Sequence, residues 1–288
     1  MLGFVNVYKP AGMTSSRVVT TIRKRFSIDK IGHMGTLDPI AEGILPLAIG
    51  KATRMFDYFL SKTKSYIVTF ELGYTTDTLD ATGKVTDTSE YVPSYEDILS
   101  AARKMIGVQM QMPPKYSAKK VGGKKAYDLA RENIDFELKP KEIEISKFEY
   151  ISHEGKSYQF LIECTSGTYI RAIGRDLGNL IGCPMCMTRL IRSQSGIFTL
   201  DNAIALDDIL SLDDISTRLL SVDAIFSQFD KEYVDSQECK YLLNGRRIHS
   251  KNSLNNHTFV YHGEDILGVS KKGNEELFLD THLRSEDD

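Results

Sequence analysis

Two widely separated segments alternate, with one interruption each, between apolar and polar residues, and this pattern constrains the fold more than any other feature. Residues 65–73, SYIVTFELG, alternate in this way, and 157–165, SYQFLIECT, match them. The residues on the apolar face of the first segment are Tyr66, Val68, Phe70 and Leu72. A period of two is typical of strands with one buried face, so the pattern predicts two similar strands of a sheet.

Helical periodicity occupies much of the chain around these strands. Thr14 or Ser15 can cap a first helix, and 52–60 and 94–106 are predicted to form two more. Thr168 is placed to cap a fourth helix after the second strand. Its predicted apolar side consists of Ile170, Ile173, Leu177 and Leu180.

The remaining segments complete the predicted fold class. A short strand is predicted at 4–8, Gly and Pro punctuate 32–50, and short strands close the chain from about Tyr233. Because strands and helices do not alternate as regular βαβ units, we predict an α+β fold with a small C-terminal appendage.

Size and composition fit a globular chain of about two domains. It has 288 residues, of which 41% are hydrophobic and 26% charged. The longest apolar runs, such as 44–49, are far shorter than the ~20 residues that cross a bilayer. The N-terminal MLGFVNVYKPAG lacks the features of an export signal. We therefore expect a cytoplasmic protein with no membrane association.

The four cysteines do not predict disulfides, because no export signal accompanies them. Cys183 and Cys186 have the spacing of metal ligands, but no second CxxC or HxxxH completes a zinc site. We expect both to be small packing residues, with no metal bound.

Basic and acidic residues are unevenly distributed. Residues 201–288 carry nine Lys or Arg against eighteen Asp or Glu, whereas 101–141 carry ten basic residues against four acidic ones. A local excess of positive charge is the footprint of a polyanionic partner, although most charge runs are simply solvated surfaces.

The densest functional signal is the segment 32–39, GHMGTLDP. Two glycines permit a tight loop, and Asp38 precedes a proline, which biases it to extended geometry. Asp38 is either a helix cap or a reactive carboxylate, and the local pattern alone favours the cap.

A second constellation, GTYIR at 167–171, falls where a strand gives way to a helix. Arg171 is either a bidentate partner of a carboxylate or an ordinary surface ion pair. Tyr66 and Tyr169 are either core aromatics or platforms for a stacked base.

Five segments, in order, resemble the motifs of one enzyme family. The stretch GHMGTLDPIAEGILPLAIGKATR resembles the signature of the TruB-type tRNA pseudouridine synthases, which modify uridine-55 in the T-loop of tRNA. VNVYKPAGMTS, SYIVTFELGYTTDTLDATG, MPPKYSAKKVGGKKAYDLAR and GTYIRAIGRDLG are similar to the other four motifs. Together they spread over residues 4–200.

The resemblance implies a role for each residue singled out above. It makes Asp38 the essential carboxylate and Arg171 its ion-pair partner. Tyr66 becomes the ring stacked on the target uracil, and His33 a residue that helps to hold the extruded nucleotide. The implied walls of the pocket are Tyr169 and Leu190. Lys9 and Pro10 become a structural turn beside the loop.

The implied reaction explains these residue types. Breaking N1–C1′ and joining C5 to C1′ is a redox-neutral isomerisation that requires neither metal nor nucleotide cofactor, and no P-loop or dinucleotide fingerprint is present. An arginine keeps a carboxylate ionised in an apolar pocket. The resemblance leaves open whether Asp38 attacks the sugar, attacks the base or removes a sugar proton.

The resemblance also implies a domain organisation. Residues 1–230 form the catalytic domain, with a pseudouridine-synthase fold built on a mixed, largely antiparallel sheet and a catalytic cleft. Residues 231–288 form a small β-rich, PUA-like domain. An insertion at about 108–141 grips RNA phosphates, and its candidate contacts are Lys115, Lys119, Lys120, Lys124, Lys125 and Arg131. The expected partner is the T-arm stem-loop of tRNA, bound by a monomer.

Two other functions fit parts of the same pattern. A guide-RNA-dependent pseudouridine synthase resembles this family but generally lacks the insertion. A non-catalytic tRNA-binding or tRNA-folding protein has no use for Asp38, Tyr66 and Arg171 together. A zinc-dependent deaminase is disfavoured by the missing HxE and PCxxC set.

Overall fold

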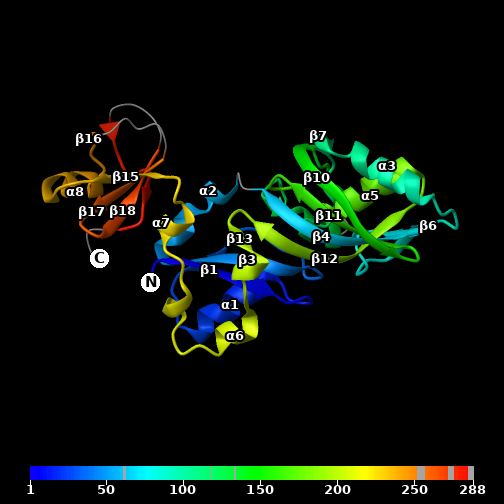
Figure 1. The fold of residues 1–288 in the computed structure, drawn as a ribbon, viewed down its shortest axis with the longest axis horizontal. Coiled ribbons are helices and arrows are strands. Elements are labelled where there is room, and N and C mark those ends of the chain that lie inside the picture. Colours follow the sequence, from blue (N-terminus) through cyan, green and yellow to red (C-terminus); the bar gives the residue numbers. More distant parts are fainter. Residues whose placement is uncertain (61–62, 118, 133, 252–256, 272–275, 285–288) are drawn as a thin grey trace.

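The computed structural model describes residues 1–288 except 61–62, 118, 133, 252–256, 272–275 and 285–288, and the side chains of 59, 60, 120 and 125 are also left out. The molecule is elongated: a large sheet with flanking helices makes up most of its length, and a smaller β-rich unit lies at one end (Figure 1). Over the described residues, no helix combines the length and apolar character needed to cross a bilayer.

One ten-stranded sheet organises residues 1–205. Within the described residues two of its pairings, β1–β14 and β3–β12, are parallel and the others antiparallel, which confirms the predicted mixed, largely antiparallel sheet. The strands along its path are β14 (Ile204–Ala205), β1 (Gly3–Lys9), β3 (Glu42–Ile49), β12 (Met185–Ser195), β4 (Lys64–Leu72), β11 (Ser157–Cys164), β10 (Lys141–Glu154) and β7 (Gly107–Gln111). Off this path, β2 (Ile31–His33) pairs with β3, and β13 (Phe198–Thr199) pairs with β12.

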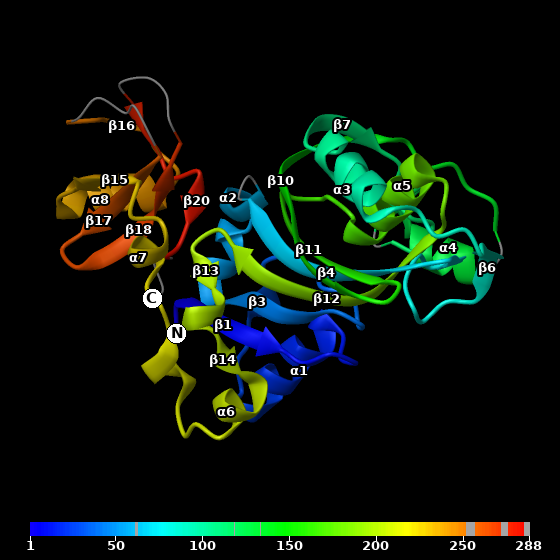
Figure 2. The same ribbon diagram turned by 45° about the vertical axis from the view of Figure 1, so that its right-hand side comes forward.

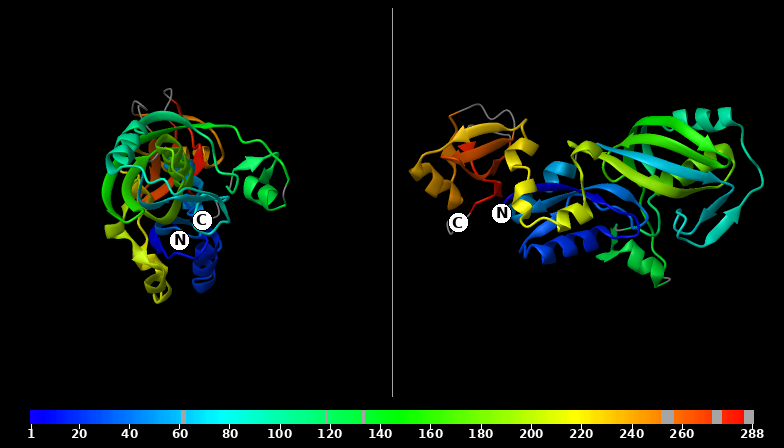
Figure 3. Two further views of the ribbon diagram at one scale, coloured as in Figure 1. Left: turned by 90° about the vertical axis from the view of Figure 1, so that its right-hand side faces the viewer. Right: turned by 60° about the horizontal axis from the view of Figure 1, so that its bottom comes forward.

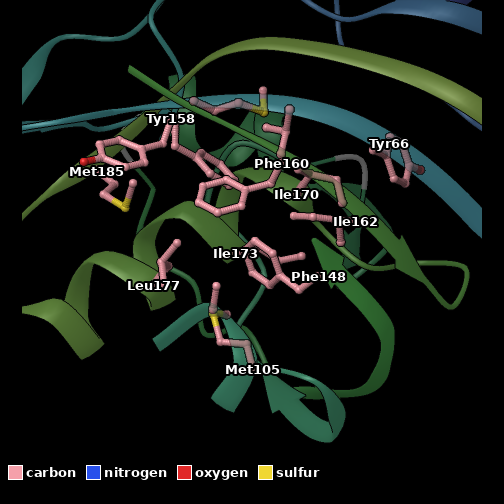
Figure 4. Packing of buried hydrophobic residues seen from close by; sticks show 14 of the residues in the cluster. Tyr66, Met105, Phe148, Tyr158, Phe160, Ile162, Ile170, Ile173, Leu177 and Met185 are labelled. Atoms are coloured by element: carbon pink, nitrogen blue, oxygen red, sulfur yellow. The ribbon is translucent and has the colours of Figure 1, made fainter. Parts of the chain in front are cut away.

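The two alternating segments form neighbouring antiparallel strands, β4 and β11, with Val68 opposite Phe160. Helices α3 (Tyr95–Lys104) and α5 (Ile170–Ile181) contribute to the core on this part of the sheet. Figure 4 shows the resulting core, in which Phe160 packs beside Ile173, while Tyr66 lies at its edge. The core thus holds α5, and with it Arg171, against β4.

Helix α5 differs in detail from the prediction. Its N-cap is Tyr169 rather than Thr168, and the last apolar position is Ile181, because Leu180 is 56% exposed. At 100° per residue Leu180 lies only 20° from Ile173 around the helix, so the helical period alone does not distinguish this exposed position from the buried ones.

The first sixty residues confirm one predicted helix, contain a strand that was not predicted, and correct a second predicted helix. Helix α1 (Ser15–Arg25) begins after Thr14, whose hydroxyl accepts from the N–H of Arg17. The 32–50 stretch contains strand β3, which is buried almost throughout and therefore lacks the alternation that marks a half-exposed strand. The helix predicted at 52–60 is instead a 3₁₀ segment, η1 (Gly50–Met55), followed by the short α2 (Asp57–Leu60).

Two small substructures flank the second half of the sheet. A hairpin of β5 (Tyr74–Thr76) and β6 (Val85–Thr88) follows β4. Between β7 and β10 the insertion forms β8 (Lys120–Val121), β9 (Lys124–Lys125) and α4 (Ala126–Arg131). Figures 2 and 3 show α4 standing away from the main sheet, near the hairpin.

The C-terminal segment forms a four-stranded sheet with its own core. Its strands are β15 (Asp230–Tyr233), β17 (Thr258–His262), β18 (Asp265–Ser270) and β20 (Thr281–His282). Helix α8 (Ser236–Leu243) follows β15, and β16 (Ile248–His249) pairs with β19 (Glu276–Leu277). The segments that connect the two sheets are η2 (Leu200–Asn202), α6 (Leu206–Leu210), η3 (Ile215–Arg218) and α7 (Val222–Ile225).

Candidate active site

A cavity of about 560 Å³ opens between the 35–38 loop, the start of β4, the 166–171 junction and β12. Residues of the insertion, among them Pro113, Ser117 and Lys119, complete its wall. Five of the six side chains that the resemblance places around the catalytic carboxylate and the target base line it, namely Asp38, Tyr66, Tyr169, Arg171 and Leu190. They lie as much as 152 positions apart in the chain, so the fold alone brings them together.

Asp38 projects from a loop that is fixed to α1. The Ser15 hydroxyl accepts from the N–H of Leu37 at 2.8 Å and donates to the Leu37 carbonyl at 3.0 Å. The chain after Asp38 leads into strand β3 and not into a helix, so the helix-cap hypothesis for Asp38 was wrong. Its carboxylate, 35% exposed, instead lies 2.8 Å from Nε of Arg171.

Arg171 is buried, with a side chain that is 7% exposed, which rules out the surface ion pair. Its Nη1 donates to the carbonyl of Thr78 at 2.8 Å, and its Nη2 donates to the carbonyl of Tyr116 at 3.0 Å. The guanidinium therefore joins the Asp38 loop, the β5–β6 hairpin and the insertion.

Asp80, which sequence reasoning did not single out, forms a second contact with Arg171. Its carboxylate lies 3.5 Å from Nη1 of Arg171, and it also accepts from the Thr78 hydroxyl and the Thr82 N–H. Asp80 is 5% exposed. The sequence feature that could have indicated Asp80 is the TDTLDATG segment, in which threonines surround this aspartate.

Tyr66 is 7% exposed and its hydroxyl interacts with the guanidinium of Arg192. Burial is the main cause that raises the pKa of Tyr66 to about 12, against a smaller opposing effect of Arg192. Arg192, also missed from the sequence, is 1% exposed and donates to the carbonyls of Ile44 and Gly35 at 2.7 and 3.1 Å. It thereby holds the base of the Asp38 loop.

Tyr169 and Leu190 form part of the cavity wall, as expected from the resemblance. The buried Gln111 side chain fixes the Tyr169 backbone from both sides, accepting from its N–H at 2.8 Å and donating to its carbonyl at 3.1 Å. Burial raises the pKa of the Tyr169 hydroxyl. Leu190 is 4% exposed on β12.

His33 and Lys9 lie behind the loop rather than in the cavity lining. His33 is on β2 opposite Leu47, its Nδ1 has no hydrogen-bond partner among the described residues, and burial lowers its pKa. Lys9 is fully buried and donates to the carbonyls of Pro10 and Met13 at 2.8 and 2.6 Å. Burial lowers its pKa to about 8.

The predicted phosphate contacts occupy different environments. Lys119 lines the cavity and donates to the Lys139 carbonyl at 2.8 Å, while Lys115 lines a second cavity of about 520 Å³ beneath α4. Lys124 and Arg131 are exposed. The side chains of the other two candidates, Lys120 and Lys125, lie outside the described residues.

Cys183 and Cys186, the pair with the spacing of metal ligands, do not line this cavity. Cys183 and Cys186 are buried and free, in agreement with a packing role. Within the described ranges, no three His, Cys, Asp or Glu side chains come together as a metal site.

Comparison with known proteins identifies the family. The sequence model described as "TruB family pseudouridylate synthase (N terminal domain)" matches residues 23–170. The chain belongs to this family. A tRNA pseudouridine synthase B of Clostridium novyi is 43% identical over 256 residues, which are 89% of this chain and 88% of the relative. Its counterpart in Clostridioides difficile is 38% identical over 93% of each chain. The TruB-family chain described here is therefore a pseudouridine synthase, an isomerase.

Solved structures agree with this assignment at the level of the fold. A crystal structure of a Cbf5-Nop10-Gar1 complex has a TM-score of 0.72 at 21% identity, covering 99% of this chain and 86% of that chain. A structure of an H/ACA RNP bound to a substrate RNA containing 2′-deoxyuridine has a TM-score of 0.68 at 19% identity, covering 98% and 84%. The predicted pseudouridine-synthase fold is thus confirmed.

Proposed function

We propose that this TruB-family enzyme converts a uridine of tRNA, uridine-55 in the T-loop, to pseudouridine. The observation that carries the proposal is the Asp38 carboxylate on the wall of a nucleotide-sized cavity, 2.8 Å from a buried guanidinium and lined also by Tyr66. The names of the relatives, tRNA pseudouridine synthase B, support tRNA as the substrate.

Asp38 is the catalytic carboxylate of this proposal. In the reaction the N1–C1′ bond breaks, the uracil turns, and a C5–C1′ bond forms. C5 then loses its proton and N1 gains one, so the atoms of substrate and product balance. The Nε–H of Arg171 stabilises the charged form of Asp38 and fixes its direction towards the cavity.

Tyr66 is the platform for the extruded base. Taking a uridine out of a folded loop costs a few kcal/mol, of which stacking on an aromatic ring returns about 1–3 kcal/mol. Leu190 and Tyr169 close the sides of the pocket around the ring. His33, behind the loop, helps to hold the nucleotide indirectly, through the backbone of β2 and the loop that follows it.

The rest of the binding energy comes from phosphate contacts in the insertion, supplied by Lys115, Lys119, Lys120, Lys124, Lys125 and Arg131. We assign residues 1–230 to the catalytic domain and 231–288 to a PUA-like domain. The enzyme acts as a monomer in the cytoplasm, and its four cysteines are suited to a reducing compartment.

The decisive experiment incubates the purified protein with an unmodified T-arm stem-loop and maps the isomerised nucleotide. We expect one pseudouridine, at the position of uridine-55. Asp38→Asn keeps the size of the side chain but removes its charge, and it should bind the RNA without forming product. Isomerisation at another uridine, or undiminished product from Asp38→Asn, would contradict the proposal.

A guide-RNA-dependent enzyme is the second candidate, because the solved structures of similar fold include, by their titles, a Cbf5-Nop10-Gar1 complex and an H/ACA RNP bound to a substrate RNA. The insertion favours the stand-alone alternative, since it places Lys119 at the cavity and the Tyr116 carbonyl on the guanidinium of Arg171. Turnover of bare tRNA by the purified chain supports the stand-alone enzyme, and turnover that requires added guide RNA supports the other.

A further inference from the structure

Two buried cations in the cavity have no carboxylate partner among the described residues. Arg192 is 1% exposed and bonds to carbonyls and Tyr66, and Lys64 is 8% exposed and donates to the Ser166 hydroxyl at 2.7 Å. Burial is the main cause that lowers the pKa of Lys64; the charge of Arg192 lowers it further, Cys164 opposes this, and Lys141 adds a smaller lowering effect. Burying a cation beside other cations is costly, so a site of this kind fits a negative charge that arrives with the ligand.

Ser166 joins Lys64 to a third cation at the mouth of the cavity. The exposed Lys141 donates to the Ser166 carbonyl at 3.1 Å, while Lys64 holds the hydroxyl of the same residue. Glycine at 167 makes this arrangement possible, because its φ is +87° and a Cβ there would lie 2.2 Å from Nζ of Lys141. The Ser166 hydroxyl, having accepted from Lys64, still has a proton to donate.

We propose that Lys64, Ser166 and Lys141 form a phosphate-binding subsite that holds a phosphodiester flanking the extruded uridine. This inference rests on the proposed RNA substrate. Each ammonium has three N–H donors, and the hydrogen bonds of these two lysines to Ser166 use one apiece. The free donors and the hydroxyl converge on the cavity wall between the base pocket and the insertion, where all three residues line the cavity.

The strand geometry favours a phosphate over the base as the occupant. Lys64 and Tyr66 lie two residues apart on β4, so their side chains leave the same face about 7 Å apart. A base that stacks on Tyr66 therefore keeps its ring away from Lys64, and the sugar spans the gap so that the adjoining phosphate reaches the lysine. Arg192 adds positive electrostatic potential to this subsite while its guanidinium stays bound to the Ile44 and Gly35 carbonyls and to Tyr66.

The test measures binding of T-arm stem-loops by the Asp38→Asn protein, with and without Lys64→Gln. Three RNAs are compared: the natural stem-loop and two that carry a single neutral methylphosphonate, 5′ or 3′ of the target uridine. We expect Lys64→Gln to weaken binding of the natural RNA about tenfold, as for a lost charge-assisted hydrogen bond. The slope of log K against log salt should fall by about 0.7–0.9.

The effects of Lys64→Gln and of one methylphosphonate on binding should be coupled. One methylphosphonate should weaken binding to the parent protein about tenfold and should cause no further loss with Lys64→Gln. Losses that add fully for both modified RNAs, or an unchanged affinity and salt slope, overturn the subsite. Normal binding by Lys64→Gln in an otherwise native chain, with slow single-turnover conversion, would assign Lys64 to the base and likewise overturn it.

Control variants separate charge from folding. Lys64→Arg keeps the charge and should retain the salt slope. Lys141→Gln alters an exposed side chain that touches the same Ser166, so it reports on the same phosphate even where Lys64→Gln destabilises the fold. Lys147 lies on β10, as Lys141 does, but it pairs with Glu149, so Lys147→Gln should leave binding unchanged.

The outcome is independent of the proposed isomerisation. Coupling between Lys64 and one methylphosphonate without any pseudouridine from the native chain would uphold the subsite and refute the proposed function. Pseudouridine formation by the native chain without that coupling would uphold the proposed function and refute the subsite.

Discussion

Arg171 is the residue on which the cavity most depends. Its three donor positions contact three separate segments: Nε the Asp38 loop, Nη1 the Thr78 carbonyl and Nη2 the Tyr116 carbonyl. A planar fork can meet these directions together, whereas an ammonium on a flexible stem cannot. The side chain thus orients the carboxylate and also anchors the insertion beside it.

Arg171→Lys should therefore lower kcat by about 100-fold or more, because a displaced carboxylate loses alignment with the substrate. It should also destabilise the fold by about 1–3 kcal/mol through unpaired buried groups. Single-turnover kinetics and urea unfolding measure the two effects. Arg175→Lys on the same helix is the control, since Arg175 is more exposed and pairs mainly with Asp176. Equal losses in both variants would contradict a special role for Arg171.

Tyr66→Phe should bind the stem-loop nearly as well as the native chain but turn over about 100-fold more slowly, if its hydroxyl relays the C5 proton, accepting it while giving up its own proton towards N1. Because burial raises the pKa of Tyr66 to about 12, the hydroxyl stays protonated between pH 6 and 10. Its removal should leave the shape of the pH–rate profile unchanged over that range. Retained turnover would exclude the hydroxyl from the chemistry.

The charge of Lys64 should make RNA binding pH-dependent. Burial, assisted by Arg192, lowers the pKa of Lys64 to about 8, so the free protein loses this charge as pH rises through 8, whereas an ordinary lysine keeps it past pH 10. Affinity should therefore fall between pH 7 and 9, and less steeply in Lys64→Gln. Of the neighbouring groups, Cys164 has its pKa raised to about 11 and stays neutral, and Lys9 titrates equally in both proteins. Parallel pH curves for the two proteins would contradict this assignment.

At the scale of elements, α5 and β4 set the position of the site. Helix α5 carries Arg171 and Tyr169 at its start, and β4 carries Tyr66 and Lys64. The two elements approach closely at Gly174, where a Cβ would lie 2.7 Å from the buried ring of Phe70. This close packing fixes the distance between the residues on the helix and those on the strand.

Gly174→Ala tests that packing. Helix propensity alone would favour alanine by about 1 kcal/mol, but overpacking against a rigid core costs about 1–3 kcal/mol. We expect net destabilisation, together with lower activity, because α5 must shift away from β4. Leu180→Ala, at a position 56% exposed on the same helix, should change stability by less than about 0.5 kcal/mol. A stabilised Gly174→Ala protein would show that Phe70 gives way.

At the scale of the whole molecule, the C-terminal unit shares a hydrophobic cluster with the large sheet. Phe259 of β17 packs on Phe229 with ring centroids 5.1 Å apart, and the same cluster contains Phe4 and Met55. Polar contacts accompany it, including donation from Arg54 to the His282 carbonyl at 2.7 Å. The two units therefore do not behave as beads on a flexible linker.

Phe259→Ala should cost about 3–5 kcal/mol and loosen the contact between the units. Limited proteolysis near residue 230 should then be faster than in the native chain. Leu277→Ala is the matched control, since it removes a buried side chain from the C-terminal unit's own core. Equal protection of the 230 region in Phe259→Ala and the native chain would mean that the shared cluster does not hold the units together.

How far the sequence predicts this fold depends on how each element is exposed. The half-buried strands β4 and β11 and the amphipathic α1 and α3 were predicted nearly in place, because water on one face imposes a period on the residues. Strand β3 was missed, since burial on both faces removes that period. The 3₁₀ segment at 50–55 was predicted as helix, because local propensity does not distinguish the two tight helices.

For the site, the motifs predicted Asp38, Tyr66, Tyr169, Arg171 and Leu190, which line the cavity, whereas the predicted His33 lies outside the lining and other lining residues were missed. Asp80, Arg192 and Lys64 carry no local mark of burial, since charged residues are usually solvated. Their importance follows from contacts such as that between Arg192 and Gly35, which are 157 positions apart.

The sequence by itself determined the kinds of residues available for the chemistry and the secondary structures that present them, because hydrophobic period and turn residues act over short distances. The tertiary structure decided which charges are paired and which are left facing the cavity. Asp38 meets Arg171, while Lys64 and Arg192 meet no described carboxylate. Burial and long-range contact set that balance, and neither is encoded in any one segment.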